Sequence, residues 1–192
     1  KGVNVSIVLK HFNYKSIVMG FFGGFSGRYI VDALENIGIA VNPVWIDDIT
    51  RINVFLNDGT DEYKFVNKGP FIKPTKQMEM LNEIKNLCDC EYLLISGSLP
   101  PGIKDVYYEQ IAQICREKEI RLILDISSPK MKDLLKYRPF LIKPNDDEVK
   151  EIFGYELDTN KKIIVALQNL IAQGAQNILL TMGDKGAYFT DG

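Results

Sequence analysis

The sequence has one histidine and few cysteines, and their spacing indicates neither a histidine-dependent catalytic site nor a metal site. Of its 192 residues only His11 is a histidine, and Cys88, Cys90 and Cys115 are the three cysteines. Ser-His-Asp and Cys-His catalysis need a histidine beside the nucleophile, so His11, expected on a helix surface next to Lys10, gives them no support. Three cysteines without a second pair or a nearby histidine do not indicate a zinc site, and we expect reduced thiols.

The sequence also lacks a strong charge of one sign and a long apolar run. It carries 25 acidic and 23 basic side chains, without the basic excess that is typical of nucleic-acid-binding proteins. No apolar stretch approaches the ~20 residues of a membrane span, and no signal-peptide pattern is present. We therefore expect no nucleic-acid partner, no membrane partner and a cytoplasmic location.

Helix-like and strand-like segments alternate along most of the chain. The apolar spacing predicts helices at 3–12, 28–37, 76–87, 106–118, 131–136, near 148 and at 161–173, and buried strands at 16–22, 92–96, 121–125, 140–143 and 177–181. Strands separated by helices imply right-handed crossovers and a parallel sheet covered on both faces. This pattern predicts an α/β fold with a mostly parallel central sheet.

The segment 41–66 differs from this alternation. It contains short strand-like runs at 44–46, 51–56 and 62–66, and Asn57-Asp58-Gly59 is a hairpin signal. These features predict a small antiparallel sheet inserted into the α/β pattern. We therefore expect a core made of residues 1–40 and 67–192 and a lid made of residues 41–66.

Polar residues follow four of the expected strands. They are Ser96-Gly97-Ser98, Asp125-Ile126-Ser127, Lys143-Pro144-Asn145 and the run TMGDKG at 181–186. Because the carboxyl ends of parallel strands meet at one edge of a sheet, these residues could line a single polar crevice. A helix that begins near Asn145 would add free backbone N–H groups, which with Lys143 could meet a phosphate.

Several of these residues allow two interpretations. Asn145 and Glu148 lie three apart and could hold a hydrated magnesium ion, but acidic side chains also suit a helix N-terminus, and spacing alone favours that interpretation. Gly183 and Gly186 could let a nucleotide approach the backbone, or could belong to an ordinary turn. Arg51 could grip a phosphate or be a solvated edge residue.

The glycine-rich stretch GFFGGFSG, residues 20–27, invites comparison with phosphate-binding loops. It lacks the GK[ST] ending of a P-loop and the GxGxxG spacing of the dinucleotide fingerprint. We interpret it as a tight connection between a strand and a helix.

Five short motifs, taken together, resemble those of the PfkB, or ribokinase-like, carbohydrate kinase family, and most closely its 1-phosphofructokinase branch. They are KGVNVS at 1–6, TRINV at 50–54, SGSLPPG at 96–102, KPNDDE at 143–148 and TMGDKG at 181–186. Each is modest alone, but they occur in the family's order and spacing along essentially the whole chain. The resemblance implies a ribokinase-like three-layer αβα fold with a small β-sheet lid over the sugar.

The resemblance also implies a role for each motif. The sugar phosphate would be bound by Lys1, Gly2, Asn4, Arg51, Ser96, Gly97 and Ser98. The ATP site would contain Lys143, Asn145, Glu148, Thr181, Gly183 and Gly186, with Asn145 and Glu148 also serving Mg²⁺. The lid would provide a homodimer interface, as in several relatives.

The activity that the resemblance implies is ATP- and magnesium-dependent phosphorylation of fructose 1-phosphate to fructose 1,6-bisphosphate. The alternatives are a tagatose-6-phosphate kinase, against which TRINV argues, and a catalytically incomplete fragment that binds nucleotide or sugar phosphate. The family's amino-terminal strand, with its sugar-binding aspartate, and its GAGD motif, with the catalytic base, have no counterpart in residues 1–192. We therefore assign no catalytic residue and expect the base beyond Gly192.

Overall fold

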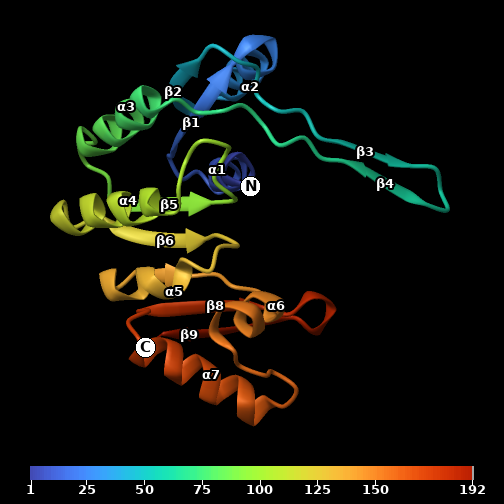
Figure 1. Cartoon of the computed structure of the whole chain (residues 1–192), viewed down its shortest axis with the longest axis vertical. Helices are drawn as coiled ribbons and strands as arrows, with labels where there is room; N and C mark the ends of the chain where they lie inside the picture. The colour runs from blue at the N-terminus through green and yellow to red at the C-terminus, as the bar shows by residue number, and fades with distance from the viewer. Residues whose placement is uncertain (192) are drawn as a thin grey trace. The chain divides into compact units, whose positions relative to one another are not determined.

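The structure is a computed structural model that describes residues 1–191 (Figure 1). The chain divides into two compact units. The first contains residues 1–83 and 99–104, and the second contains residues 84–98 and those from 105 onward.

The first unit contains a parallel strand pair and a separate hairpin. Its elements are α1 (Gly2–His11), β1 (Ile17–Gly23), α2 (Gly24–Asn36), β2 (Ala40–Ile46), β3 (Val54–Asn57), β4 (Glu62–Phe65) and most of α3 (Pro74–Lys85). β1 pairs in parallel with β2, which corrects the prediction that the strand at 44–46 belongs to the antiparallel lid sheet. The physical reason is that α2 connects β1 to β2 as a crossover, and Val44 on β2 is buried.

The core of the first unit lies between α2 and this strand pair. Val18 and Phe22 of β1 are four residues apart and share one face of the strand, and Val31 and Leu34 of α2 share one face of the helix. These four side chains and Ile39 form one buried cluster.

The glycine-rich stretch at 20–27 contains the predicted connection between a strand and a helix, because β1 ends at Gly23 and α2 begins at Gly24.

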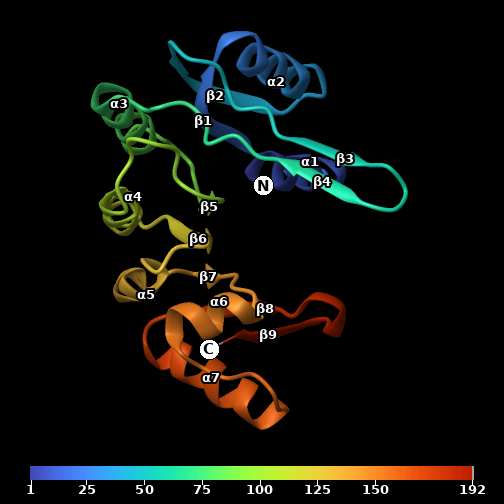
Figure 2. The same ribbon diagram turned by 45° about the vertical axis from the view of Figure 1, so that its right-hand side comes forward.

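The hairpin β3–β4 extends from the first unit as a ribbon (Figures 1 and 2). Its antiparallel register runs from Val54 opposite Phe65 to Asn57 opposite Glu62, and all eight residues are exposed. At the turn, Asp58 Oδ1 accepts hydrogen bonds from the N–H groups of Thr60 and Asp61 and from the Thr60 hydroxyl. These bonds lower the pKa of the Asp58 carboxyl below its ordinary value.

The second unit is built on a five-stranded sheet in the order β5-β6-β7-β8-β9. All neighbouring strands are parallel except β8 and β9, so the predicted mostly parallel α/β sheet is confirmed. The elements are β5 (Tyr92–Ser96), α4 (Val106–Glu117), β6 (Arg121–Asp125), α5 (Met131–Leu134), η1 (Leu135–Tyr137), β7 (Leu141–Ile142), α6 (Asp146–Glu148), η2 (Val149–Phe153), α7 (Asn160–Ala172), β8 (Asn177–Thr181), η3 (Gly183–Lys185) and β9 (Ala187–Asp191).

Three strands of the second unit's sheet carry fully buried apolar side chains. Leu124, Ile142, Ile178 and Leu180 on its central strands are 0% exposed, and so is Leu170 on α7. α4 packs against β6, and α7 packs against β8. The carboxyl ends of β6, β7 and β8 are thus fixed by a packed interior. Among residues 1–191, no helix is both long and apolar enough to cross a membrane.

Candidate functional site

The carboxyl ends of three neighbouring strands meet at Asp125. Ser96 Oγ, at the end of β5, donates a hydrogen bond to Asp125 Oδ2 at 3.0 Å. Lys143, which follows β7, places Nζ 3.0 Å from Asp125 Oδ1. The backbone N–H of Gly97 donates to the Asp125 carbonyl oxygen at 3.0 Å. Asp125, at the end of β6, therefore fixes one residue from each neighbouring strand end.

This ion pair is well shielded on the carboxylate side. The side chain of Asp125 is only 13% exposed, whereas that of Lys143 is 36% exposed. Charge-assisted hydrogen bonds of this kind are stronger than neutral ones, and partial burial strengthens them further. Lys143 consequently presents an oriented ammonium group whose outer side reaches solvent.

A capping box begins the short helix after β7. Asn145 Oδ1 accepts a hydrogen bond from the Glu148 N–H at 2.7 Å, and Glu148 Oε2 accepts one from the Asn145 N–H at 3.0 Å. Ser127 Oγ, after the end of β6, donates to the other oxygen of Glu148, Oε1. The helix-terminus interpretation of the Asn-x-x-Glu spacing is therefore observed.

Magnesium fits the same group of residues. Mg²⁺ keeps several waters and usually takes one or two protein carboxylates together with substrate phosphates. Each Glu148 oxygen accepts one hydrogen bond, which leaves each of them a lone pair for an ion. Within residues 1–191, no cluster of three or more His, Cys, Asp or Glu side chains is arranged to hold a metal. Glu148 would hold the ion with water and phosphate oxygens.

The predicted nucleotide turn lies beside this capping box. Thr181 forms an isolated parallel bridge with Asn145, and its N–H donates to the Pro144 carbonyl at 3.0 Å. Gly183 and Gly186 have φ angles of 56° and 89°, which favour glycine, and no described atom lies within 4 Å of where either β-carbon would be. The segment forms a tight turn, as one interpretation expected, and its backbone is open to approach.

The remaining sequence-predicted residues lie in two places. Ser98, two residues beyond the end of β5 in the second unit, is exposed. Lys1, Gly2 and Asn4 lie at the start of α1 in the first unit, where the Val5 N–H donates to the Lys1 carbonyl at 3.3 Å.

Arg51 follows a tightly anchored residue at the base of the hairpin. Thr50 Oγ1 accepts from the Gly23 N–H at 3.0 Å, the Thr50 carbonyl accepts from Ser26 Oγ at 2.7 Å, and the Thr50 N–H donates to the Gly23 carbonyl at 2.9 Å. A β-carbon at Gly27 would lie 2.9 Å from Thr50 Oγ1. The glycine-rich stretch therefore serves to hold Thr50, while Arg51 itself is exposed.

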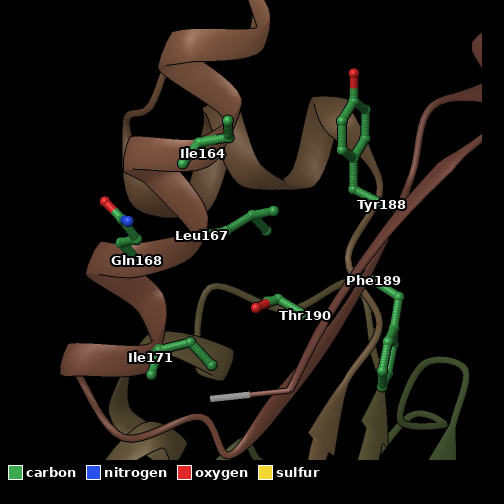
Figure 3. A pocket seen from close by; sticks show the side chains of 7 residues that line it. All are labelled: Ile164, Leu167, Gln168, Ile171, Tyr188, Phe189 and Thr190. Carbon is green, nitrogen blue, oxygen red and sulfur yellow. The ribbon is translucent and has the colours of Figure 1, made fainter.

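Two hollows of the second unit lie apart from Ser96, Asp125 and Lys143, here called the Asp125 network. One, of about 370 Å³, lies between α7 and β9 and is lined by Ile164, Leu167, Gln168, Ile171, Tyr188, Phe189 and Thr190 (Figure 3). None of these is a predicted site residue, and none is charged. A smaller hollow, of about 150 Å³, is lined in part by Asp146, Met182 and Lys185. It therefore adjoins the capping box and the nucleotide turn.

Sequence reasoning missed two residues that contact predicted site residues in the structure. Asp125 ends β6 and Ser127 lies two residues beyond it, and the sequence gives neither of them a role. Their partners, Ser96, Lys143 and Glu148, are far from them in sequence. The signal that could have found Asp125 is its position directly after the apolar run Leu122 to Leu124.

Comparison with known proteins gives concordant matches along the whole chain. The family described as pfkB family carbohydrate kinase matches residues 1–192. A D-tagatose-1-phosphate kinase of Klebsiella oxytoca is 44% identical over 192 residues, which are 100% of this chain and 63% of that protein. A 1-phosphofructokinase of Borreliella burgdorferi is 35% identical over 192 residues, which are 100% of this chain and 62% of that protein.

The structure gives the same result. The crystal structure of phosphofructokinase-2 from Escherichia coli in complex with fructose-6-phosphate has a TM-score of 0.91 at 26% identity, over 99% of this chain and 64% of that one. The chain thus spans about 63% of the length of the curated relatives that it matches.

Proposed function

The chain belongs to the pfkB family of carbohydrate kinases, and on this premise we propose that the protein transfers the γ-phosphate of ATP to a ketohexose phosphate. The observation that carries the proposal is the convergence at the strand ends of an oriented ammonium group and a capped carboxylate, Lys143 and Glu148. Phosphoryl transfer depends on positioning and on neutralising charge, and these two groups offer both.

Each strand-end residue has a part in this proposal. Lys143, oriented by Asp125, contacts the ATP phosphates, and Glu148, oriented by Asn145 and Ser127, holds Mg²⁺. Mg²⁺ held by Glu148 would supply positive charge that neutralises the charge developing on the phosphate oxygens. The open backbone at the nucleotide turn, formed by Thr181, Gly183 and Gly186, lines the nucleotide.

The sugar phosphate is assigned to the residues that the family motifs indicate. They are Lys1, Gly2, Asn4, Arg51, Ser96, Gly97 and Ser98. Arg51 supplies a guanidinium group, whose planar fork suits a phosphate.

The proposed substrate is a ketohexose 1-phosphate, with fructose 1-phosphate giving fructose 1,6-bisphosphate as the specific reaction. The names of two relatives support this substrate class. One is a D-tagatose-1-phosphate kinase, and the other is a 1-phosphofructokinase. The TRINV motif at 50–54 favours fructose 1-phosphate over tagatose 6-phosphate. D-tagatose 1-phosphate and tagatose 6-phosphate are the competing substrates.

A binding module without turnover is the second candidate for the 192-residue chain. The chain spans about 63% of the length of its curated relatives, and none of its residues is assigned as the catalytic base. Activity is therefore proposed for the whole protein, which we place in the cytoplasm.

The hairpin supports a homodimer in this proposal. Val54, Phe55, Leu56, Tyr63 and Phe65 are all exposed on it, and a two-stranded ribbon with apolar side chains in water is marginally stable alone. Sedimentation of a Phe55→Asp variant tests this: a dimeric parent and a monomeric variant support the interface, and an unchanged mass removes it.

The activity is tested by ADP release with MgATP and fructose 1-phosphate, D-tagatose 1-phosphate, tagatose 6-phosphate or no sugar. We expect release that depends on sugar and is fastest with a 1-phosphate. Faster turnover of tagatose 6-phosphate would overturn the proposed substrate. ADP release that is not accompanied by formation of a sugar bisphosphate would overturn the proposed kinase activity. If the 192-residue chain binds ATP but is inactive while a longer form turns over, the chain is the binding module.

A further inference from the structure

Two asparagine side chains join the legs of the hairpin beyond the end of its ladder. The ladder ends at the pair Val54 and Phe65. Farther along the legs, Asn53 Oδ1 accepts a hydrogen bond from the Asn67 N–H at 3.2 Å, and Asn67 Nδ2 donates one to the Ile52 carbonyl at 2.8 Å. The two amides therefore continue the cross-strand connection where backbone pairing has stopped.

The same leg contacts Arg51. The Asn67 carbonyl lies 3.5 Å from Nη1 of Arg51. The aliphatic part of Arg51 lies along Gly69, where an added β-carbon would come within 3.4 Å of Arg51 Cδ. Asn67 thus contacts the three consecutive residues 51–53 through its backbone N–H, its carbonyl and its side chain.

We propose that Asn53 and Asn67, here called the asparagine pair, are positioning residues that set the direction of the Arg51 side chain. The inference rests on the proposed function, in which Arg51 contacts the substrate phosphate. Residues 50–53 are anchored at one end, where Thr50 bonds to Gly23 and Ser26. The asparagine pair fixes the other end, so the backbone of Arg51 is held on both sides although the residue is exposed to water.

The two asparagines use opposite ends of their side-chain amides. Asn53 accepts through its oxygen, whereas Asn67 donates through its nitrogen. Aspartate has nearly the same shape as asparagine and keeps the acceptor but loses the donor. Asn53→Asp therefore preserves the hydrogen bond from the Asn67 N–H. Asn67→Asp instead removes the hydrogen bond to the Ile52 carbonyl and places a carboxylate oxygen opposite that carbonyl oxygen. Both changes add one negative charge to the same contact, so the effect of charge is shared.

The test is to measure the Kd of fructose 1-phosphate and the Kd of ATP separately, by calorimetric titration. Asn67→Asp is expected to weaken fructose 1-phosphate binding about fivefold more than Asn53→Asp does, the size of one lost hydrogen bond, with ATP binding unchanged in both. Asn57→Asp is the control, because Asn57 Oδ1 accepts from the Gly59 N–H at the hairpin tip, 2.8 Å away. Equal effects of Asn53→Asp and Asn67→Asp, or no effect of Asn67→Asp, would overturn the inference.

Hydrogen exchange distinguishes failure of this inference from failure of the proposed function. The Asn67 N–H is expected to exchange faster in Asn53→Ala, which removes its acceptor, than in the parent or in Asn57→Ala. Unchanged exchange would refute the asparagine pair even if fructose 1-phosphate binds. Unchanged fructose 1-phosphate affinity in Arg51→Ala would instead remove Arg51 from the phosphate site, whatever the exchange result.

Discussion

The hairpin β3–β4 and the sheet β5-β6-β7-β8-β9 hold their proposed site residues by different means. Leu180 on β8 is 0% exposed, whereas Leu56 on β3 is 54% exposed. The sheet presents Lys143 and Glu148 from strand ends that a packed core fixes. The hairpin presents Arg51 from a base held by hydrogen bonds that water can replace. In the proposed function, this difference gives a preformed site for the nucleotide and a movable contact for the sugar phosphate.

The largest effect is expected when a leucine side chain is truncated to alanine in each of the two regions. Leu180→Ala should lower the free energy of unfolding by about 3 kcal/mol, because it leaves a cavity in a closed core. Leu56→Ala should change it by less than about 0.5 kcal/mol, because its side chain already contacts water. Urea denaturation measures both. A large loss with Leu56→Ala would show that the hairpin is part of the folded core.

Arg51→Ala tests the hairpin side of the comparison. Loss of a charged hydrogen bond should raise the KM for the sugar phosphate about tenfold, with the KM for ATP unchanged. Steady-state kinetics with each substrate varied in turn measure this, and Arg28→Ala, which removes an arginine that stacks on Trp45, is the matched control. An unchanged sugar-phosphate KM would exclude Arg51 from the site.

Glu148→Gln tests the sheet side by separating the helix cap from the metal. Glutamine keeps an acceptor for the Asn145 N–H, so the free energy of unfolding should change by less than about 0.5 kcal/mol. It removes the negative charge, so the Mg²⁺ concentration needed for half-maximal activity should rise about tenfold. Glu151→Gln, on an exposed residue of η2, is the control. Unchanged Mg²⁺ dependence would leave Glu148 as a capping residue alone.

The sequence predicted the second unit better than the first for a physical reason. The strands at 92–96, 121–125 and 177–181 have the predicted bounds, because each is a short apolar run that ends at a polar or turn residue. The strand at 44–46 was wrongly placed with the lid, because its neighbour is chosen by tertiary packing against β1 rather than by its own pattern.

The site shows the same limit. Lys143, Asn145 and Glu148 could be grouped from the sequence because they follow one strand, and Thr181 joins them because parallel strand ends meet. The Asp125 network and the asparagine pair could not be predicted. Their hydrogen bonds join Ser96 to Asp125 and Asn53 to Asn67 across long separations, with no periodic pattern to mark the partners.

The smallest expected effect is on the acid dependence of the unfolding free energy, and it compares a carboxyl group of the second unit with one of the hairpin. In the second unit, Lys130 Nζ and Lys136 Nζ lie 2.8 and 3.0 Å from the two oxygens of Glu109. Hydrogen bonds from Lys130 and then Lys136 lower the pKa of Glu109 below its ordinary value of 4.5. A carboxyl group with a lowered pKa in the folded state stabilises the protein above 4.5, and this stabilisation is lost as the pH falls through the folded-state pKa. Glu109→Gln should therefore make the unfolding free energy depend less on pH below 4.5.

Asp58 provides the matched titration in the hairpin. Its pKa is also lowered from 3.8, by hydrogen bonds from the Asp61 and Thr60 N–H groups, so its protonation likewise removes stabilisation as the pH falls below that value. Because the turn lies on an exposed ribbon, Asp58→Asn should speed hydrogen exchange at Thr60 and Asp61 while leaving the acid dependence of global unfolding nearly as in the parent. A flattened global acid response in Asp58→Asn, equal to that of Glu109→Gln, would mean that the hairpin and the sheet unfold as one cooperative unit.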